Sequence, residues 1–150
     1  MNFSDFVTHN GKRINKEHFI HLIQVSRIDG KFSQSELEML HKEGRKFGLT
    51  DPEIDQLIEA EINHSYDPPY SLKDKFEQLY KVAEMILADE AVTDSEKRIL
   101  KRFAIEAGFD DKIVENLFDL LIDGIRKGVD EEKLFNEFKQ KHLFRGSKSV

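Results

Sequence analysis

The sequence predicts an all-α fold: a seven-helix bundle in which two tandem three-helix repeats with pseudo-twofold symmetry precede a C-terminal helix. Apolar residues recur at the three-to-four-residue spacing of helices along most of the chain. Two segments sixty residues apart match without a gap. No segment alternates apolar and polar residues for long enough to indicate a strand.

The repeat emerges when Ile28–Leu49 is set over Ala88–Phe109, at a shift of sixty residues. The register continues downstream through apolar pairs such as Ile54/Val114. A gapless match that preserves apolar positions over this length is hard to attribute to chance. The identical pairs in the aligned segments include Asp29/Asp89, Ser35/Ser95, Glu36/Glu96, Leu40/Leu100 and Gly48/Gly108.

Each repeat is predicted to form three helices within a single domain that spans residues 1–150. A Pro-rich joint, His64–Ser71, cannot be helical throughout and separates the repeats. Repeat one, about 16–63, holds helices over 16–28, 34–47 and 52–63. Repeat two, about 72–126, holds helices over 72–88, 94–107 and 112–126, and the C-terminal helix covers about 130–143.

The second helix of each repeat has a predicted start signal. Ser33-x-x-Glu36 and Thr93-x-x-Glu96 are capping boxes, in which the hydroxyl and the carboxylate each accept a backbone N–H of the first turn. The same helices are expected to end at Gly48 and Gly108, because glycine tolerates the left-handed conformation common after a helix. We expect Asp51 to cap the third helix of repeat one, and Asp110 or Asp111 to cap its counterpart.

Composition limits the classes of function. The chain has no cysteine, which excludes thiolate catalysis and thiolate metal sites. No apolar run approaches the roughly 18 residues of a membrane-spanning helix, and no signal peptide is evident, so we expect a cytoplasmic protein. A net charge of −6 disfavours nucleic acid as a partner. The basic segment 139–150 offers a weak route to contact with an anionic membrane surface.

The acidic residues of the repeated motif have two interpretations. In the first, they only mark helix ends: Asp terminates one helix, and Ser or Thr together with Glu caps the start of the next. Alternatively, they gather into an acidic face whose carboxylates bind a divalent cation such as Ca²⁺. The candidate ligands are Asp29, Glu36, Asp89, Glu90 and Glu96.

Signals for other chemistry are weak. His18 and His21 lie three residues apart on one helix, but a third zinc ligand at a suitable spacing is lacking. The sequence has no Gly-rich phosphate loop and no nucleophile elbow. We therefore expect a protein that is not an enzyme.

The motif at Ile28–Leu49 joins a helix ending in Asp-Gly to Phe-Ser-x-x-Glu-Leu-x-x-Leu and a closing Phe-Gly-Leu. Together with its copy, it resembles the TerB-like family, whose members carry two such units in one helical domain. The resemblance covers about residues 16–126. The second copy departs from the pattern because Glu90 replaces the glycine and adds a carboxylate.

The resemblance implies a role in tellurite resistance or a related bacterial stress response, with divalent-cation binding at Asp29, Glu36, Asp89 and Glu96. On this basis we expect a non-catalytic binding or scaffold module that recognises an as yet unidentified protein partner. Two alternatives remain open. One is a metal-dependent enzyme that uses the acidic motif, and the other is a structural protein that homodimerises through apolar helix faces.

Overall fold

The computed structural model describes residues 6–7, 13–26, 32–61, 63–88 and 92–144. In these residues the chain is all-α, with seven α-helices, as the sequence predicts. A π-helical segment, η1 (Lys139–Phe144), continues the last helix. The helices are α1 (Lys16–Ser26), α2 (Gln34–Arg45), α3 (Asp51–Glu61), α4 (Leu72–Leu87), α5 (Asp94–Glu106), α6 (Asp111–Arg126) and α7 (Glu131–Phe138).

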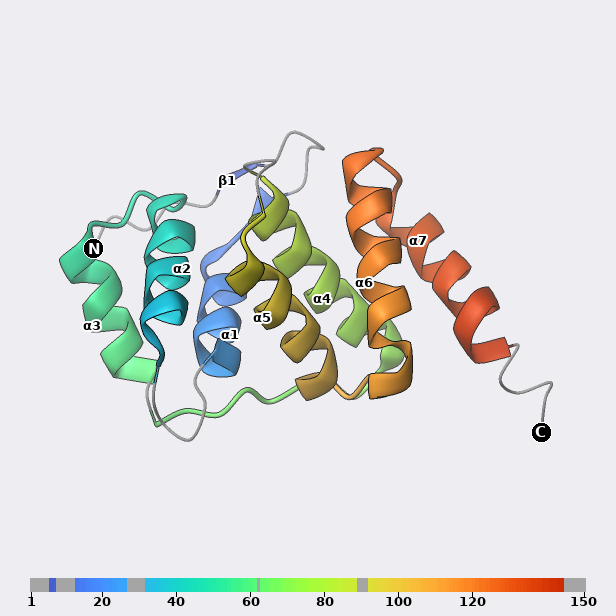
Figure 1. Cartoon of the computed structure of the whole chain (residues 1–150), viewed down its shortest axis with the longest axis horizontal. Helices are drawn as coiled ribbons and strands as arrows, with labels where there is room; N and C mark the ends of the chain where they lie inside the picture. The colour runs from blue at the N-terminus through green and yellow to red at the C-terminus, as the bar shows by residue number, and fades with distance from the viewer. Residues whose placement is uncertain (1–5, 8–12, 27–31, 62, 89–91, 145–150) are drawn as a thin grey trace.

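The helices form two mutually packed groups of three. Helices α1, α2 and α3 all contact one another, and so do α4, α5 and α6. The groups meet where α1 packs on α4 and α5, and where α2 packs on α5. Figure 1 shows α3 at one end of the body, α5 crossing its middle, and α6 and α7 at the other end. Helix α7 covers α4 and α6.

The hydrophobic core lies between these groups, and α1 and α4 supply much of it. Phe19, Leu22 and Ile23 of α1 are completely buried. On α4, Leu79 and Met85 are equally inaccessible, and buried side chains cover most of that helix's circumference. Apolar residues occupy more of the circumference of α1 and α4 than a single narrow face. Such a distribution predicts a largely buried helix, as the structure shows.

The predicted capping boxes are both present. Ser33 N–H donates to Glu36 Oε1 at 2.7 Å, and Glu36 N–H donates to Ser33 Oγ at 3.1 Å. The matching distances at Thr93 and Glu96 are 2.9 and 3.1 Å. Helices α2 and α5 therefore begin sixty residues apart, with the same local chemistry.

The predicted helix ends are also confirmed at two glycines. Gly48 has φ 82° and Gly108 has φ 104°, both in the left-handed region. A side chain at Gly108 would also meet the Lys75 ammonium, since a Cβ there would lie 2.8 Å from Nζ. Helix termination at these two positions thus rests on glycine.

The predicted cap of α3 was wrong by one residue. Thr50, not Asp51, caps this helix: Glu53 N–H donates to Thr50 Oγ1 at 3.3 Å, and Thr50 N–H donates to Glu53 Oε1 at 2.9 Å. Asp51 is the first residue of α3, and its carboxylate reaches α2 instead. In the second group, Asp110 is the cap, as one of the two predicted candidates.

A short β-pair was not predicted from the sequence. Strands β1 (Phe6–Val7) and β2 (Arg13–Ile14) pair antiparallel, with Phe6 opposite Ile14. Strands of two residues leave no readable alternation in a sequence. Ile14 is fully buried and β2 contacts α4, so β2 lies against the helical body.

Removing either capping hydroxyl should destabilise the fold. We expect Ser33→Ala and Thr93→Ala each to lower the free energy of unfolding by about 0.5–2 kcal/mol, because each leaves a helix N–H without its acceptor. Urea denaturation measures the effect. Gln34→Ala, at an exposed position in the first turn of α2, is the control and should change stability little. Two cap variants as stable as the wild type would contradict the assigned helix starts.

Candidate functional site

Of the five predicted cation ligands, the structure describes Glu36 and Glu96, and both act as helix caps. Asp29, Asp89 and Glu90 lie outside the described residues. Among the residues that are described, no group of three or more His, Asp or Glu side chains is arranged to hold a metal ion. The five-residue cation site therefore stays a prediction, while the capping role of its two described members is confirmed.

Glu96 joins the two helix groups. Its side chain is completely buried, and Lys42 of α2 donates to its Oε1 at 2.9 Å. The same oxygen accepts the Thr93 N–H that starts α5. The second oxygen, Oε2, is also buried and has no hydrogen-bond partner among the described residues. Transfer from water strongly disfavours the charged form of a buried carboxylate. The Lys42 ammonium and the Thr93 N–H offset that cost for Glu96.

A second lysine, Lys46 at the C-cap of α2, also reaches the other group of helices. Lys46 Nζ lies 2.8 Å from the buried carboxylate of Glu43 and donates to the Met85 carbonyl of α4 at 2.7 Å. A cation at the carboxyl end of a helix also interacts favourably with the helix dipole. Lys42 and Lys46 thus fasten α2 to α5 and to the end of α4.

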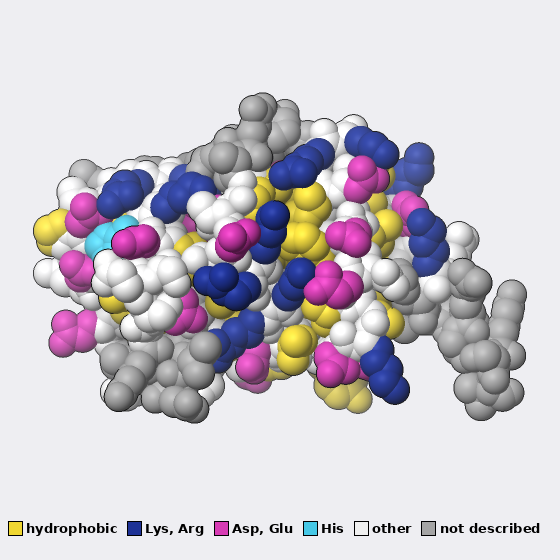
Figure 2. Space-filling view, viewed as in Figure 1, with side chains coloured by type: hydrophobic (Ala, Val, Ile, Leu, Met, Phe, Trp, Pro, Cys, Tyr) yellow, Lys and Arg dark blue, Asp and Glu magenta, His cyan; other side chains and the backbone are white. Residues whose placement is uncertain are grey.

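An open groove of about 380 Å³ lies on the outer face of α5. Ile99 forms its apolar floor, and Ile105, which is 49% exposed, forms part of its wall. Figure 2 shows Lys and Arg side chains beside hydrophobic ones over the middle of this face, where α5 crosses the view. We call this the α5 groove, and its lining residues are Glu36 of α2 and Ser95, Arg98, Ile99, Lys101, Arg102 and Ile105 of α5.

The sixty-residue register relates two residues of the α5 groove to the Lys42–Glu96 ion pair. It pairs Lys42 with Arg102 and Glu96 with Glu36. In the Lys42–Glu96 ion pair the carboxylate is completely buried and the lysine side chain is 31% exposed, whereas Glu36 and Arg102 line the open groove. Positions related by the register therefore have different surroundings: Glu96 is completely buried, whereas Glu36 is only partly buried at the groove.

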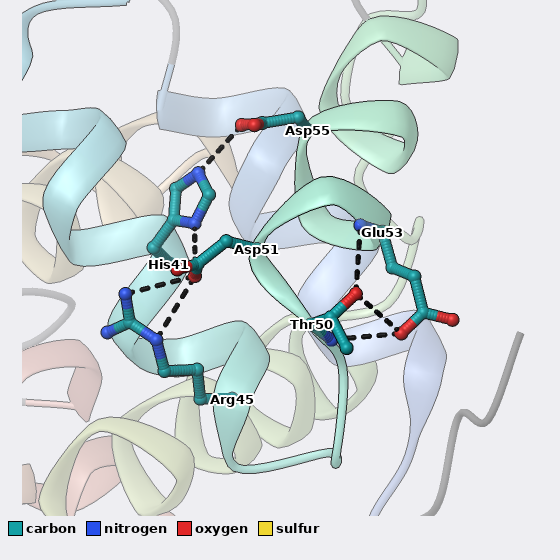
Figure 3. A network of polar contacts seen from close by, with 6 residues as sticks. All are labelled: His41, Arg45, Thr50, Asp51, Glu53 and Asp55. Atoms are coloured by element: carbon teal, nitrogen blue, oxygen red, sulfur yellow. Dashed lines mark hydrogen bonds and ion pairs between the residues drawn. The ribbon is translucent and has the colours of Figure 1, made fainter.

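A separate polar network joins α2 to α3 (Figure 3). His41 Nδ1 lies 2.8 Å from Asp51 Oδ1, and His41 Nε2 lies 2.7 Å from Asp55 Oδ1. Arg45 Nε also donates to Asp51 Oδ1, at 3.1 Å. A neutral imidazole carries only one N–H, so two hydrogen bonds to carboxylates require the protonated ring. Partial burial opposes the charge of His41, yet its bonds to Asp51 and Asp55 raise its pKa above the ordinary value.

His18 and His21, the pair considered for zinc, have a different environment. Burial, with the nearby Lys81 charge, lowers the pKa of His18 to about 4, and its Nδ1 accepts the Asn15 N–H at 3.2 Å. Burial also lowers the pKa of His21, whose ring packs edge-on against Tyr66 at 5.4 Å between centroids. Both rings are thus neutral near pH 7 and lie against the first helix start and the Pro-rich joint.

Sequence reasoning missed the α5 groove and the His41 network. The groove had a readable signal: Ser95, Arg98, Ile99 and Arg102 recur at helical spacing on one side of α5, where Ile105 adds an exposed apolar residue. The network had none, because His41 and Asp55 are brought together only by the packing of α2 on α3.

No family model, curated protein or solved structure matches this chain. In the described part of the chain, no helix is long and apolar enough to cross a membrane.

The His41 network should make stability depend on pH. The raised pKa of His41 means that the folded state favours the protonated ring. The network's contribution to the free energy of unfolding is therefore fully present below pH 6.5 and is lost as the pH rises through that raised pKa. We expect an NMR titration to give His41 a pKa above 6.5, and Asp51→Asn or Asp55→Asn to lower it. Asp119→Asn, an exposed change on α6, is the control and should leave it in place. A His41 pKa at or below 6.5 in the wild type would contradict the network.

Proposed function

We propose that this chain is a non-catalytic binding module of TerB-like organisation, built from two helical repeats related by a pseudo-twofold axis. The α5 groove is its binding surface. The observation that carries the proposal is this solvent-open, apolar groove with exposed Ile105 in its wall, on a helix that joins both halves of the molecule. Contacts among known protein partners commonly centre on such apolar depressions with polar surroundings.

The repeat relationship is supported by the starts of α2 and α5 and of α3 and α6, each sixty residues apart, and by the packing within each group of three helices. It predicts that α1–α3 superpose on α4–α6 after a rotation near 180°. The positions of α3 and α6 toward opposite ends of the body, with α1, α4 and α5 between them, fit such an axis (Figure 1). The TerB-like resemblance then suggests a place in a bacterial stress-response or tellurite-resistance complex.

A divalent cation fits this proposal as a regulator of the same region. Glu96 contributes one buried oxygen, Oε2, that no described donor satisfies. Glu36 lines the α5 groove and belongs to the other copy of the motif. Asp29, Asp89 and Glu90 would complete a shared set of oxygen ligands. Each motif alone offers fewer ligands than the 6–8 that Ca²⁺ prefers, so any site must use both copies or retain several waters.

Photo-crosslinking tests the binding surface. A photoreactive amino acid placed at Ile105 in the protein expressed in its native cells should yield a defined adduct with one partner. The same amino acid at Glu59, an exposed position on α3, is the control and should not yield that adduct. Equal adduct patterns at both positions, or no specific adduct at Ile105, would contradict the groove as the binding surface.

Titration calorimetry tests whether the acidic motifs bind a divalent cation. We expect Ca²⁺ to bind weakly, on the order of 10⁻⁴ M, and the Asp29→Asn/Asp89→Asn double variant to lose that binding. Asp119→Asn/Asp123→Asn removes the same charge from exposed positions of α6 and should keep it. Identical heats for the wild type and the first double variant, or no binding at millimolar Ca²⁺, would leave the acidic motifs as helix caps alone.

A further inference from the structure

We infer that the partner segment of the α5 groove is an acidic amphipathic α-helix that buries one large apolar side chain beside Ile99 and Ile105 and directs carboxylates at the cations around them. This inference rests on the proposed binding function and adds the chemistry of the partner. Its basis is the charge of the groove, which opposes the charge of the chain. The net charge of the protein is −6, whereas the groove is lined by three cationic side chains and one acidic one.

Two of the three cations that line the groove, Arg98 and Lys101, have partners that an incoming carboxylate can replace. Arg98 is exposed and donates to the neutral Ser95 hydroxyl at 3.2 Å. Lys101 lies 2.8 Å from Glu115, whose side chain is 69% exposed. Exposed ion pairs of this kind contribute little to stability, so an incoming carboxylate can replace Glu115 at small cost. Arginine further favours carboxylates, because its guanidinium can bind both oxygens at once.

The shape of the groove favours a helix as its occupant. The lining residues of α5 follow a single helical face from Ser95 to Ile105, a length of about three turns. An amphipathic helix places its apolar residues at matching intervals of three and four and leaves its flanks free for charge. The partial exposure of Ile105 gives such a side chain apolar area to cover, and Ile99 below it is already buried.

Two other occupants of the α5 groove, nucleic acid and a second copy of the chain, agree less well with the charges of the protein. The acidic balance of the whole chain repels a phosphate backbone over any extended contact. A second copy would bring its own net charge of −6 against the first, so only a locally acidic face of it could enter the groove.

Fluorescence anisotropy with designed peptides tests the inference. The probe is a fluorescein-labelled 18-residue helix with Leu at every third or fourth position and Glu elsewhere. The control peptide keeps the Leu positions and carries Lys in place of Glu. We expect the acidic peptide to bind at least about tenfold more tightly than the basic one, with an affinity that falls as salt is added. Equal binding of the two peptides would overturn the inference.

Variants of α5 locate the site. Arg98→Glu should weaken binding of the acidic peptide by about fivefold or more, and Ile105→Ser by about tenfold. Lys97→Glu is the matched control: it makes the same charge change at an exposed position of the same helix outside the groove, and should weaken binding less than twofold. Equal losses for Arg98→Glu and Lys97→Glu would show general charge attraction and overturn the site.

Two further results separate this inference from the proposed function. A specific adduct at Ile105 in cells, together with no preference for the acidic peptide, overturns the acidic-helix chemistry and leaves the binding function in place. Sedimentation that shows a dimer of the wild type and a monomer of Ile105→Ser identifies a second copy as the occupant and also overturns it. A monomeric wild type that binds the acidic peptide supports it.

Discussion

The architecture depends on one buried carboxylate, that of Glu96. It starts α5 by accepting the Thr93 N–H, and it holds α2 against α5 by accepting Lys42. A local requirement of helix capping and a tertiary requirement of packing are thus met by the same oxygen. Removal of Lys42 would leave the carboxylate buried without its cation, which is costly, whereas an exposed pair could rely on water. This ion pair fixes where α2 meets α5, beside the packing of α1 on α4 and α5.

The residues that correspond to Glu96 and Lys42 in the sixty-residue register, Glu36 and Arg102, have a different environment. Glu36 also caps its helix, but its side chain is only partly buried and lines the α5 groove beside Arg102. One copy of the motif therefore joins α2 to α5, while the other borders the α5 groove. Lys46 accounts for part of this difference, because its bond to the α4 carboxyl end has no counterpart in the other repeat, where the register places Glu106. Differences at a few positions of the sixty-residue register thus accompany the different surroundings of Glu36 and Glu96.

Much of the fold followed from local signals in the sequence. The helix starts at Ser33 and Thr93 and the ends at Gly48 and Gly108 are set by neighbouring residues, so a pattern can predict them. The misplaced cap at Asp51 shows the limit of that reasoning, because Thr50 and Asp51 are both suitable caps. Only the packing of α2 on α3 selects Thr50, since it offers the Asp51 carboxylate a better partner in His41.

The candidate site was less accessible to sequence reasoning for a related reason. Glu36 and Glu96 were identified as a repeated pair, but their different burial depends on long-range contacts. The burial of Glu96 beneath Lys42 joins residues 54 positions apart. Motif spacing identifies which residues correspond, and tertiary packing decides that Glu96 is buried while Glu36 lines the α5 groove.

The most direct test of this account is a pair of double-mutant cycles on the free energy of unfolding. One cycle combines Lys42→Ala with Glu96→Gln, and the other combines Arg102→Ala with Glu36→Gln. The account predicts a coupling of about 1–3 kcal/mol between Lys42 and the buried Glu96, and a smaller one, below about 1 kcal/mol, between Arg102 and Glu36 at the groove. Equal couplings, or a Lys42–Glu96 coupling near zero, would contradict the claim that the first pair joins the two halves and the second borders a surface open to a partner.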